Sequence, residues 1–151
     1  MAALDNLVRR FQNTDRNTRL EMLLDLSERL PPLPERFHEA RDHGVNRVTE
    51  CQTPVFLFAE LNEGKFQLHA DVPREAPTVR GFVSLLAKGL NGADPATVSS
   101  IPSDLLDQLK LGEALGMTRT QGLSAVVQRV KRMASTLTAG AVSGKTVSGE
   151  R

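Results

Sequence analysis

The chain has 151 residues, a length that suits one domain with a buried core, and 25% of its residues are charged. The formal net charge is +1 and the chain contains neither Trp nor Tyr. It therefore offers no basic field and few aromatic stacking groups, which argues against nucleic-acid binding. No apolar run approaches the roughly 18 residues of a membrane span, and the N-terminal segment lacks the apolar run of a signal peptide.

Two amphipathic helices are expected at the N-terminal end. Apolar residues recur at helical spacing over residues 4–11, and a second helix is predicted over residues 16–30, with Asp15 as its N-cap. Pro31 and Pro32 should end this helix, because proline lacks the backbone N–H and clashes with the preceding turn. Residues 31–44 show no periodicity and are predicted to be an irregular surface segment.

A small sheet is expected next. Residues 45–48, 55–61 and 65–70 are short β-favouring stretches and are predicted to be strands. Asn62-Glu63-Gly64 has the composition of a hairpin turn, so the last two strands should pair antiparallel. Three consecutive strands predict a three-stranded antiparallel sheet flanked by helices, which places the chain in the α+β class.

The C-terminal half is predicted to be helical. Helices are expected over residues 78–90, as short turns after Asp94-Pro95 and after Ser103, and over residues 119–136 with Thr118 as N-cap. Residues 138–151 are small, polar and rich in glycine and serine, which is typical of a disordered tail. We therefore expect a single domain over residues 1–137, followed by a disordered segment.

The single cysteine lies in a polar stretch between the first two predicted strands, Thr49-Glu50-Cys51-Gln52-Thr53. A cysteine that only fills a core is usually found within an apolar run. Cys51 is therefore a candidate reactive thiol, with an incidental thiol as the alternative. One cysteine cannot form an internal disulfide, so a reducing, cytoplasmic location is expected.

Other chemistry has weaker support in the sequence. The three histidines, at positions 38, 43 and 69, lack the spacing of a metal site, although a Cys-His pair with Cys51 stays open as an alternative. Residues 139–146 match a relaxed phosphate-loop pattern, but a helix rather than a strand precedes them, so the match is attributed to chance. The cations at 129–132 suit the solvated face of a helix near its C-terminus.

Four blocks, in order, resemble the SufE family of sulfur acceptors. The resemblance covers about residues 4–137, and the block around the cysteine is similar to the family pattern V-x-G-C-Q-S-x-V-W. The four blocks are Val48-x-x-Cys51-Gln52-Thr53-x-Val55-Phe56, Phe66-Gln67-Leu68-x-Ala70-Asp71, Val79-Arg80-Gly81-Phe82-Val83 and Thr118-Arg119-Thr120-Gln121-Gly122-Leu123.

The resemblance implies an α+β fold similar to that of the scaffold protein IscU. It implies that Cys51 accepts sulfur from the persulfide of a pyridoxal-phosphate cysteine desulfurase of the SufS type, stimulates that enzyme, and passes the sulfur to an iron–sulfur scaffold. The chain would bind no cofactor or metal itself and would be a transfer partner rather than a free-standing enzyme. The thiol would be tucked in at rest, and its loop would swing out on docking.

The resemblance also implies supporting residues. Arg119 and Gln121 would lie near the cysteine loop, with Gln52 and Asp71 as further members of the matching blocks. Glu50 stands where the family usually has glycine, and glutamate would be strained there if the position requires a positive φ. A non-catalytic module that shares the fold and only regulates a desulfurase is the alternative function.

Overall fold

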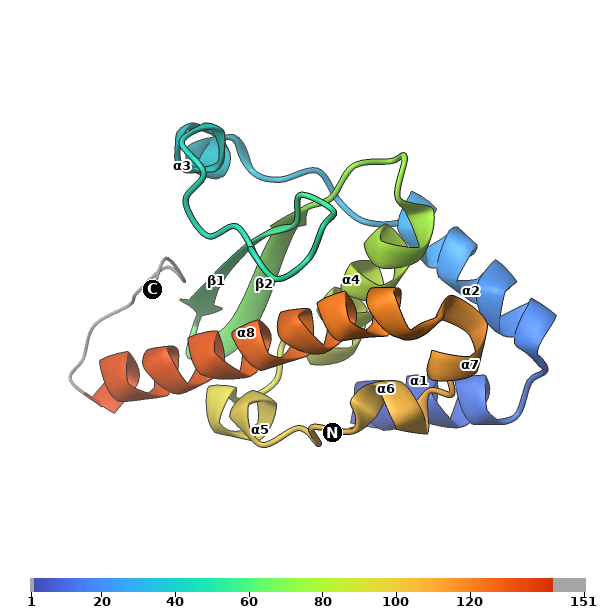
Figure 1. Cartoon of the computed structure of the whole chain (residues 1–151). Helices are drawn as coiled ribbons and strands as arrows, with labels where there is room; N and C mark the ends of the chain where they lie inside the picture. The colour runs from blue at the N-terminus through green and yellow to red at the C-terminus, as the bar shows by residue number, and fades with distance from the viewer. Residues whose placement is uncertain (1, 143–151) are drawn as a thin grey trace.

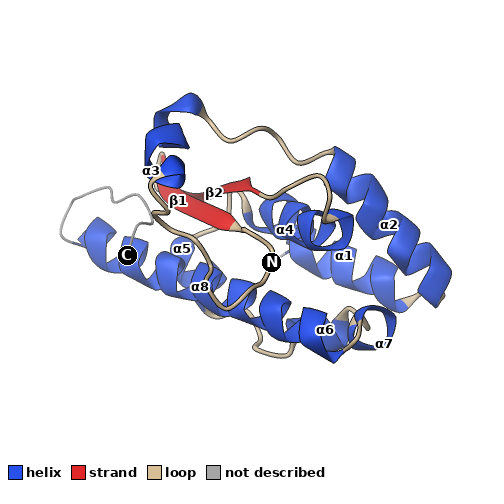
Figure 2. Ribbon diagram, turned by 45° about the horizontal axis from the view of Figure 1, so that its top comes forward, coloured by secondary structure: helices blue, strands red, loops and turns tan. Residues whose placement is uncertain are grey.

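The structure, a computed structural model, describes residues 2–142 (Figure 1). Helices surround a single two-stranded hairpin (Figure 2), which confirms the α+β class. No helix in the described part of the chain is long and apolar enough to cross a membrane. In chain order the elements are α1 (Ala2–Gln12), α2 (Arg16–Glu28), the 3-10 helix η1 (Glu35–Phe37), α3 (His38–Asp42), β1 (Phe56–Asn62), β2 (Lys65–Asp71), α4 (Pro77–Leu90), α5 (Pro95–Ser99), α6 (Leu105–Gln108), α7 (Gly112–Leu115) and α8 (Met117–Val142).

The two N-terminal helices form as predicted. The side chain of Asp15 caps α2 by accepting a hydrogen bond from the Thr18 N–H at 2.8 Å. The hydrogen bonds from Thr18 stabilise the carboxylate, so the pKa of Asp15 lies below its ordinary value. Helix α2 ends at Glu28, shortly before the two prolines.

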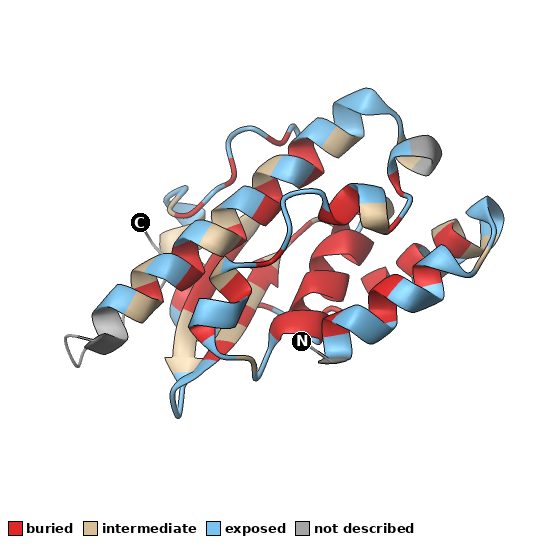
Figure 3. Cartoon of the chain, turned by 90° about the horizontal axis from the view of Figure 1, so that it is seen from below, coloured by how far each residue is buried: buried red, intermediate tan, exposed pale blue. Residues whose placement is uncertain are grey.

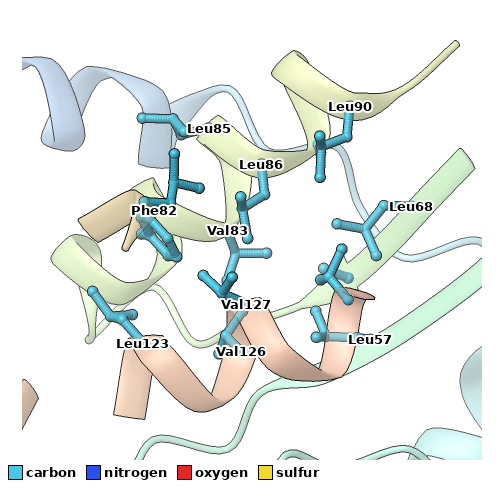
Figure 4. Packing of buried hydrophobic residues seen from close by; sticks show 14 of the residues in the cluster. Leu57, Leu68, Phe82, Val83, Leu85, Leu86, Leu90, Leu123, Val126 and Val127 are labelled. Atoms are coloured by element: carbon cyan, nitrogen blue, oxygen red, sulfur yellow. The ribbon is translucent and has the colours of Figure 1, made fainter. Parts of the chain in front are cut away.

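Helix α4 lies at the centre of the molecule, with every residue from 79 to 87 buried (Figure 3). It contacts α1 and α2 on one side and β2 and α8 on the other. Apolar side chains of α4, α8 and both strands interdigitate in one continuous core (Figure 4). Because α4 is apolar around most of its circumference, only a position surrounded by other elements can bury it.

The hairpin has the predicted turn and register. Strands β1 and β2 pair antiparallel from Phe56 opposite Asp71 to Asn62 opposite Lys65. Glu63 and Gly64 have φ values of 53° and 81°, as expected for a two-residue turn with both central residues in the left-handed region. The turn sequence therefore identified this hairpin correctly.

The prediction of a third strand over residues 45–48 is wrong. This stretch forms only an isolated bridge, between Arg47 and Phe56. The cause is Asn46, which has a φ of 66° and so interrupts the extended backbone. Its side-chain amide donates to the Leu57 carbonyl at 2.9 Å, which favours this local geometry over a regular ladder.

Residues 31–44 are more ordered than predicted, because they include η1 and α3. Phe37 stacks on Phe58 of β1, with ring centroids 4.7 Å apart, and Leu33 joins the same small cluster. This segment therefore covers the face of the hairpin opposite the main core, and α3 lies on that side in Figure 1. Both faces of the hairpin are covered.

The C-terminal helices differ from the prediction at their ends. Helix α8 begins at Met117, so Thr118 lies within the helix and is not its N-cap. The residue that precedes α6 is Asp104 rather than Ser103, and α7 was not predicted. Helix α8 continues to Val142, five residues past the expected end of the domain, and residues 143–151 of the expected tail lie outside the described part of the chain.

Adjacent residues of α4 attach it to α2. A Cβ at Gly81 would lie 2.1 Å from the backbone oxygen of Leu23, so the two helices approach each other through glycine. The buried guanidinium of Arg80 donates to the Ser27 carbonyl at 2.8 Å and to the Leu30 carbonyl at 3.4 Å, at the C-terminal end of α2. Burial lowers the pKa of Arg80, and the nearby charge of Arg74 adds to this effect.

We predict that Gly81→Ala lowers the free energy of unfolding by about 2–3 kcal/mol, because the added methyl group forces α2 away from α4. Chemical denaturation followed by circular dichroism measures this change. The matched control is Gly112→Ala, where an added Cβ meets no atom within 4 Å. Equal denaturation midpoints for the two variants would contradict the prediction.

Candidate functional site

Cys51 lies in the loop that precedes β1, and its side chain points into the protein. Only 6% of the residue is exposed, and it belongs to the main apolar cluster. Its neighbours Glu50 and Gln52 are exposed. The loop therefore buries its thiol while keeping its polar side chains in solvent.

The two ends of this loop are tied together. The Leu57 N–H donates to the Asn46 carbonyl at 3.2 Å, and the Val48 N–H donates to the Val55 carbonyl at 2.8 Å. Between these ends, among the described residues, the backbone hydrogen bond is the one from the Cys51 N–H to the Val48 carbonyl, at 3.2 Å. The base of the loop is thus fixed, whereas residues 49–54 are held mainly by the burial of one side chain.

The first turns of α8 form the surface on which Cys51 rests. A Cβ at Gly122 would lie 3.1 Å from the Cys51 Sγ, so the thiol packs directly on the helix backbone. Leu123 and Val126, which follow on the inner face of α8, are fully buried and fix the helix to the core. The thiol therefore rests on a part of α8 that the core holds in place.

A cavity of about 570 Å³ opens beside the thiol. One wall is the loop, a second is Val79 at the start of α4, and the third is the segment from Leu115 to Gly122. Gly116, with a φ of 85°, makes the turn between α7 and α8. Met117 lies at this turn with 77% of its surface exposed, and it is one of two large apolar residues, with Leu24, that are exposed in the described part of the chain.

The structure brings three of the four supporting residues to this cavity. Gln52, Arg119 and Gln121 line it together with Cys51. The Arg119 Nη1 donates to the Thr78 hydroxyl at 3.3 Å and so links the first turn of α8 to the first turn of α4. Its suggested effect on the loop or on the thiolate stays a prediction.

Asp71 lies elsewhere. Its carboxylate pairs with Arg41 at 3.2 Å and lines a separate cavity that Arg80 also lines. Asp71 is opposite Phe56 in the hairpin register, and Phe56 follows the cysteine loop directly in the chain. However, its side chain belongs to the face covered by α3, so any role for it at the thiol would have to be indirect.

Glu50 is accommodated without backbone strain. The non-glycine residues with positive φ in the described part of the chain are Asn46, Glu63 and Lys110. Glu50 therefore does not have a positive φ, and it is an exposed residue that lines the cavity beside Cys51. The strain that a positive φ would have imposed does not occur.

The histidines do not join the site. His38 and His43 bond to the backbone oxygens of Leu33 and Glu39, and His69 bonds to the Glu60 carboxylate at 2.7 Å. None of the three lines the cavity beside Cys51. Within residues 2–142 no group of three His, Cys, Asp or Glu side chains is placed to hold a metal ion. The Cys-His alternative has no support in this geometry.

Sequence reasoning missed Gly122 and Met117 as parts of the site. A glycine within a predicted helix is a sequence signal of close packing, because it costs helix stability relative to alanine. Nothing in the sequence alone indicated that Cys51 is the neighbour of Gly122.

A model of the SufE domain, described as an Fe-S metabolism associated domain, matches residues 5–134, and the chain therefore belongs to the SufE family. An uncharacterized SufE-like protein of Mycobacterium tuberculosis is 35% identical over 132 residues, which cover 87% of this chain and 90% of that protein. The sulfur acceptor protein CsdE of Escherichia coli is 27% identical over 110 residues, which cover 72% of this chain and 71% of CsdE.

The fold agrees with a solved structure. The solution structure of a hypothetical protein from Thermus thermophilus matches with a TM-score of 0.78 at 32% identity, and the match covers 91% of this chain and 96% of that one. The resemblance found in the four sequence blocks is thereby confirmed at the level of family. The expected likeness to IscU stays a prediction.

We predict that the thiol of Cys51 is protected in the folded protein. Iodoacetamide should alkylate it at least roughly tenfold more slowly in native buffer than in denaturant, because a buried thiol must first be exposed by local opening. Intact mass spectrometry over time gives both rates, with N-acetylcysteine as the control for the effect of denaturant on the reagent. Equal rates in the two conditions would show that Cys51 is exposed in solution.

Proposed function

We propose that this protein is a sulfur acceptor whose Cys51 takes sulfane sulfur from the persulfide of a pyridoxal-phosphate cysteine desulfurase. The observation that carries the proposal is the lone thiol on an anchored loop, buried beside a cavity, in a chain of the SufE family. A relative, CsdE, is itself named a sulfur acceptor protein. Transfer onward to an iron–sulfur scaffold completes the proposal.

The chemistry is a thiol exchange in which no net oxidation occurs. The Cys51 thiolate attacks the outer sulfur of the desulfurase persulfide, and a new S–S bond forms to the Cys51 Sγ. The bond between that outer sulfur and the desulfurase cysteine breaks, and the desulfurase cysteine leaves as a thiolate. The proton that Cys51 gave up is taken by solvent or by the departing thiolate.

The cysteine count suits this chemistry. The sequence has one cysteine, so no second thiol in the chain can attack the persulfide and release the sulfur as hydrosulfide with formation of an internal disulfide. The sulfur therefore stays on Cys51 until an external thiol removes it. A reducing cytoplasm would keep this thiol free between cycles.

The cavity supports the storage of sulfur. A persulfide extends the side chain by about 2 Å, the length of an S–S bond. The space beside Cys51, bounded by Val79, Leu115 and the first turn of α8, adjoins the thiol. A terminal sulfur placed there would be sheltered from solvent thiols.

Transfer requires the loop to open, because a cysteine residue with only 6% of its surface exposed cannot bring its thiol to a partner cysteine. The rim of the cavity offers a docking surface for the desulfurase, with the exposed Met117 as an apolar contact and Arg119, Gln121 and Gln52 as polar ones. Contacts made only in the open state would favour opening. Acceptance of the sulfur by Cys51 would stimulate the desulfurase, because it frees the desulfurase cysteine for the next turnover.

A second candidate function is a regulatory module that binds a desulfurase through the same rim without accepting sulfur. The exposed rim alone would serve this role, and the chemistry of Cys51 would then be irrelevant. The two functions differ in what the cysteine must do, so a single substitution separates them.

We predict that the wild-type protein raises the turnover of a SufS-type desulfurase and is recovered with one additional sulfur, about 32 Da, by intact mass spectrometry. Cys51→Ser should carry no sulfur and give no stimulation, while still binding the desulfurase in a pull-down. Stimulation that survives in Cys51→Ser would support the regulatory module. Absence of both stimulation and added sulfur with several desulfurases would contradict both functions.

A further inference from the structure

We propose that Gly122 is a positioning residue that determines how deeply Cys51 is sheltered, so that a single methyl group at this position would displace the thiol outward and make it easier to expose. The contact belongs to the resting protein and does not depend on sulfur transfer. Its consequence for sulfur handling rests on the function proposed above.

Cys51 fills the space beside Gly122. The three atoms nearest to a Cβ at Gly122 all belong to Cys51: Sγ at 3.1 Å, Cα at 3.5 Å and Cβ at 3.6 Å. The two carbon distances are ordinary van der Waals contacts, whereas the distance to sulfur is tight enough that the sulfur would have to move by a few tenths of an ångström. The conflict therefore involves one atom, the reactive one.

The loop is the element that would move. Helix α8 is fixed to the core by Leu123, Val126 and Val127, which are at most 2% exposed. Residues 49–54 are held by one turn hydrogen bond and by the burial of Cys51 itself. Because the loop has fewer contacts, the added methyl group should displace Cys51 and leave α8 in place.

Helix propensity does not account for a glycine at this position. Glycine within a helix is less favourable than alanine, because glycine loses more conformational freedom when the chain folds. Alanine would therefore stabilise α8 if the space were free. The Cys51 side chain occupies that space. Gly122→Ala should therefore lower the stability if the contact with Cys51 matters, and raise it if the space is free.

The first experiment measures the alkylation rate of Cys51 by iodoacetamide in native buffer. In Gly122→Ala the rate should rise at least about tenfold, because overpacking by one methyl group is sufficient to shift an opening equilibrium by that factor. The matched control is Gly89→Ala, where a Cβ in α4 would meet the Leu4 Cδ1 at the same 3.1 Å, away from Cys51. Its rate should stay within about twofold of wild type, because its clash does not touch the loop.

An equal rise in both variants would mean that general destabilisation exposes the thiol, and it would overturn the positioning role. An unchanged rate in Gly122→Ala would overturn it as well. These outcomes concern the resting protein and need no desulfurase.

The second experiment is a double-mutant cycle with Cys51→Ala. Gly122→Ala should lower the denaturation midpoint of the wild-type protein but raise it in the Cys51→Ala background, where the clashing sulfur is absent. The same change in both backgrounds would overturn the proposal. If Gly122→Ala fails to fold alone, a folded double variant upholds the proposal, and an unfolded double variant overturns it.

The positioning role and the sulfur-acceptor role can fail separately. Faster alkylation of Gly122→Ala, with no persulfide accepted by the wild-type protein, would uphold the role of Gly122 and contradict the proposed function. Normal acceptance of sulfur by the wild-type protein, with unchanged alkylation of Gly122→Ala, would overturn the role of Gly122 alone.

Discussion

The burial of α4 sets the positions of the elements around it. A helix that is apolar on nearly all sides must be enclosed, and α1, α2, β2 and α8 enclose this one. The enclosure is close because the backbone of α2 occupies the space that a side chain at position 81 would take. Arg80 then satisfies carbonyl groups at the end of α2 that lack helical partners. The Arg80-Gly81 pair, which resembles a family motif, therefore supports the scaffold and not the thiol.

The candidate site lies where α4 and α8 contact the cysteine loop, residues 49–54, which has few hydrogen bonds of its own. The first turns of α4 and α8 converge beside the cysteine loop and are linked by the Arg119–Thr78 hydrogen bond. Both helices continue into the core, where Phe82 of α4 and Leu123 of α8 are among the packed side chains (Figure 4), and this packing holds their first turns in place. The loop against these turns is fixed at its base by Asn46 and Val48 and is held at its tip by Cys51. A rigid wall facing a weakly held loop is an arrangement in which the loop alone can open.

Sequence patterns predicted the parts of this molecule that depend on local rules. The hairpin followed from Asn62-Glu63-Gly64, and the cysteine was correctly placed in a loop that precedes β1, although the described part of the chain has no strand before that loop. The third strand failed because β propensity does not reveal that Asn46 adopts a left-handed conformation. The helices within residues 31–44 depend on the packing of Phe37 against Phe58, a contact between distant residues. Asp71 was assigned to the site because it lies in a segment that resembles the family pattern. The alternation of side chains along β2 instead places it on the face of the hairpin that α3 covers, where it pairs with Arg41.

The proposed role as a sulfur carrier requires that the sulfur be protected and also released, and the loop would allow both because little holds it closed. Burying one small side chain contributes only about 1–2 kcal/mol, which a few contacts with a partner can offset. The direction of storage is also constrained. The Cys51 Sγ already packs on the backbone of α8 at Gly122, which leaves no room for an added sulfur on that side, whereas the cavity that Cys51 lines offers space. If Cys51 carries sulfur as proposed, the same glycine that admits the thiol to the core directs the terminal sulfur toward the rim, where a partner would dock.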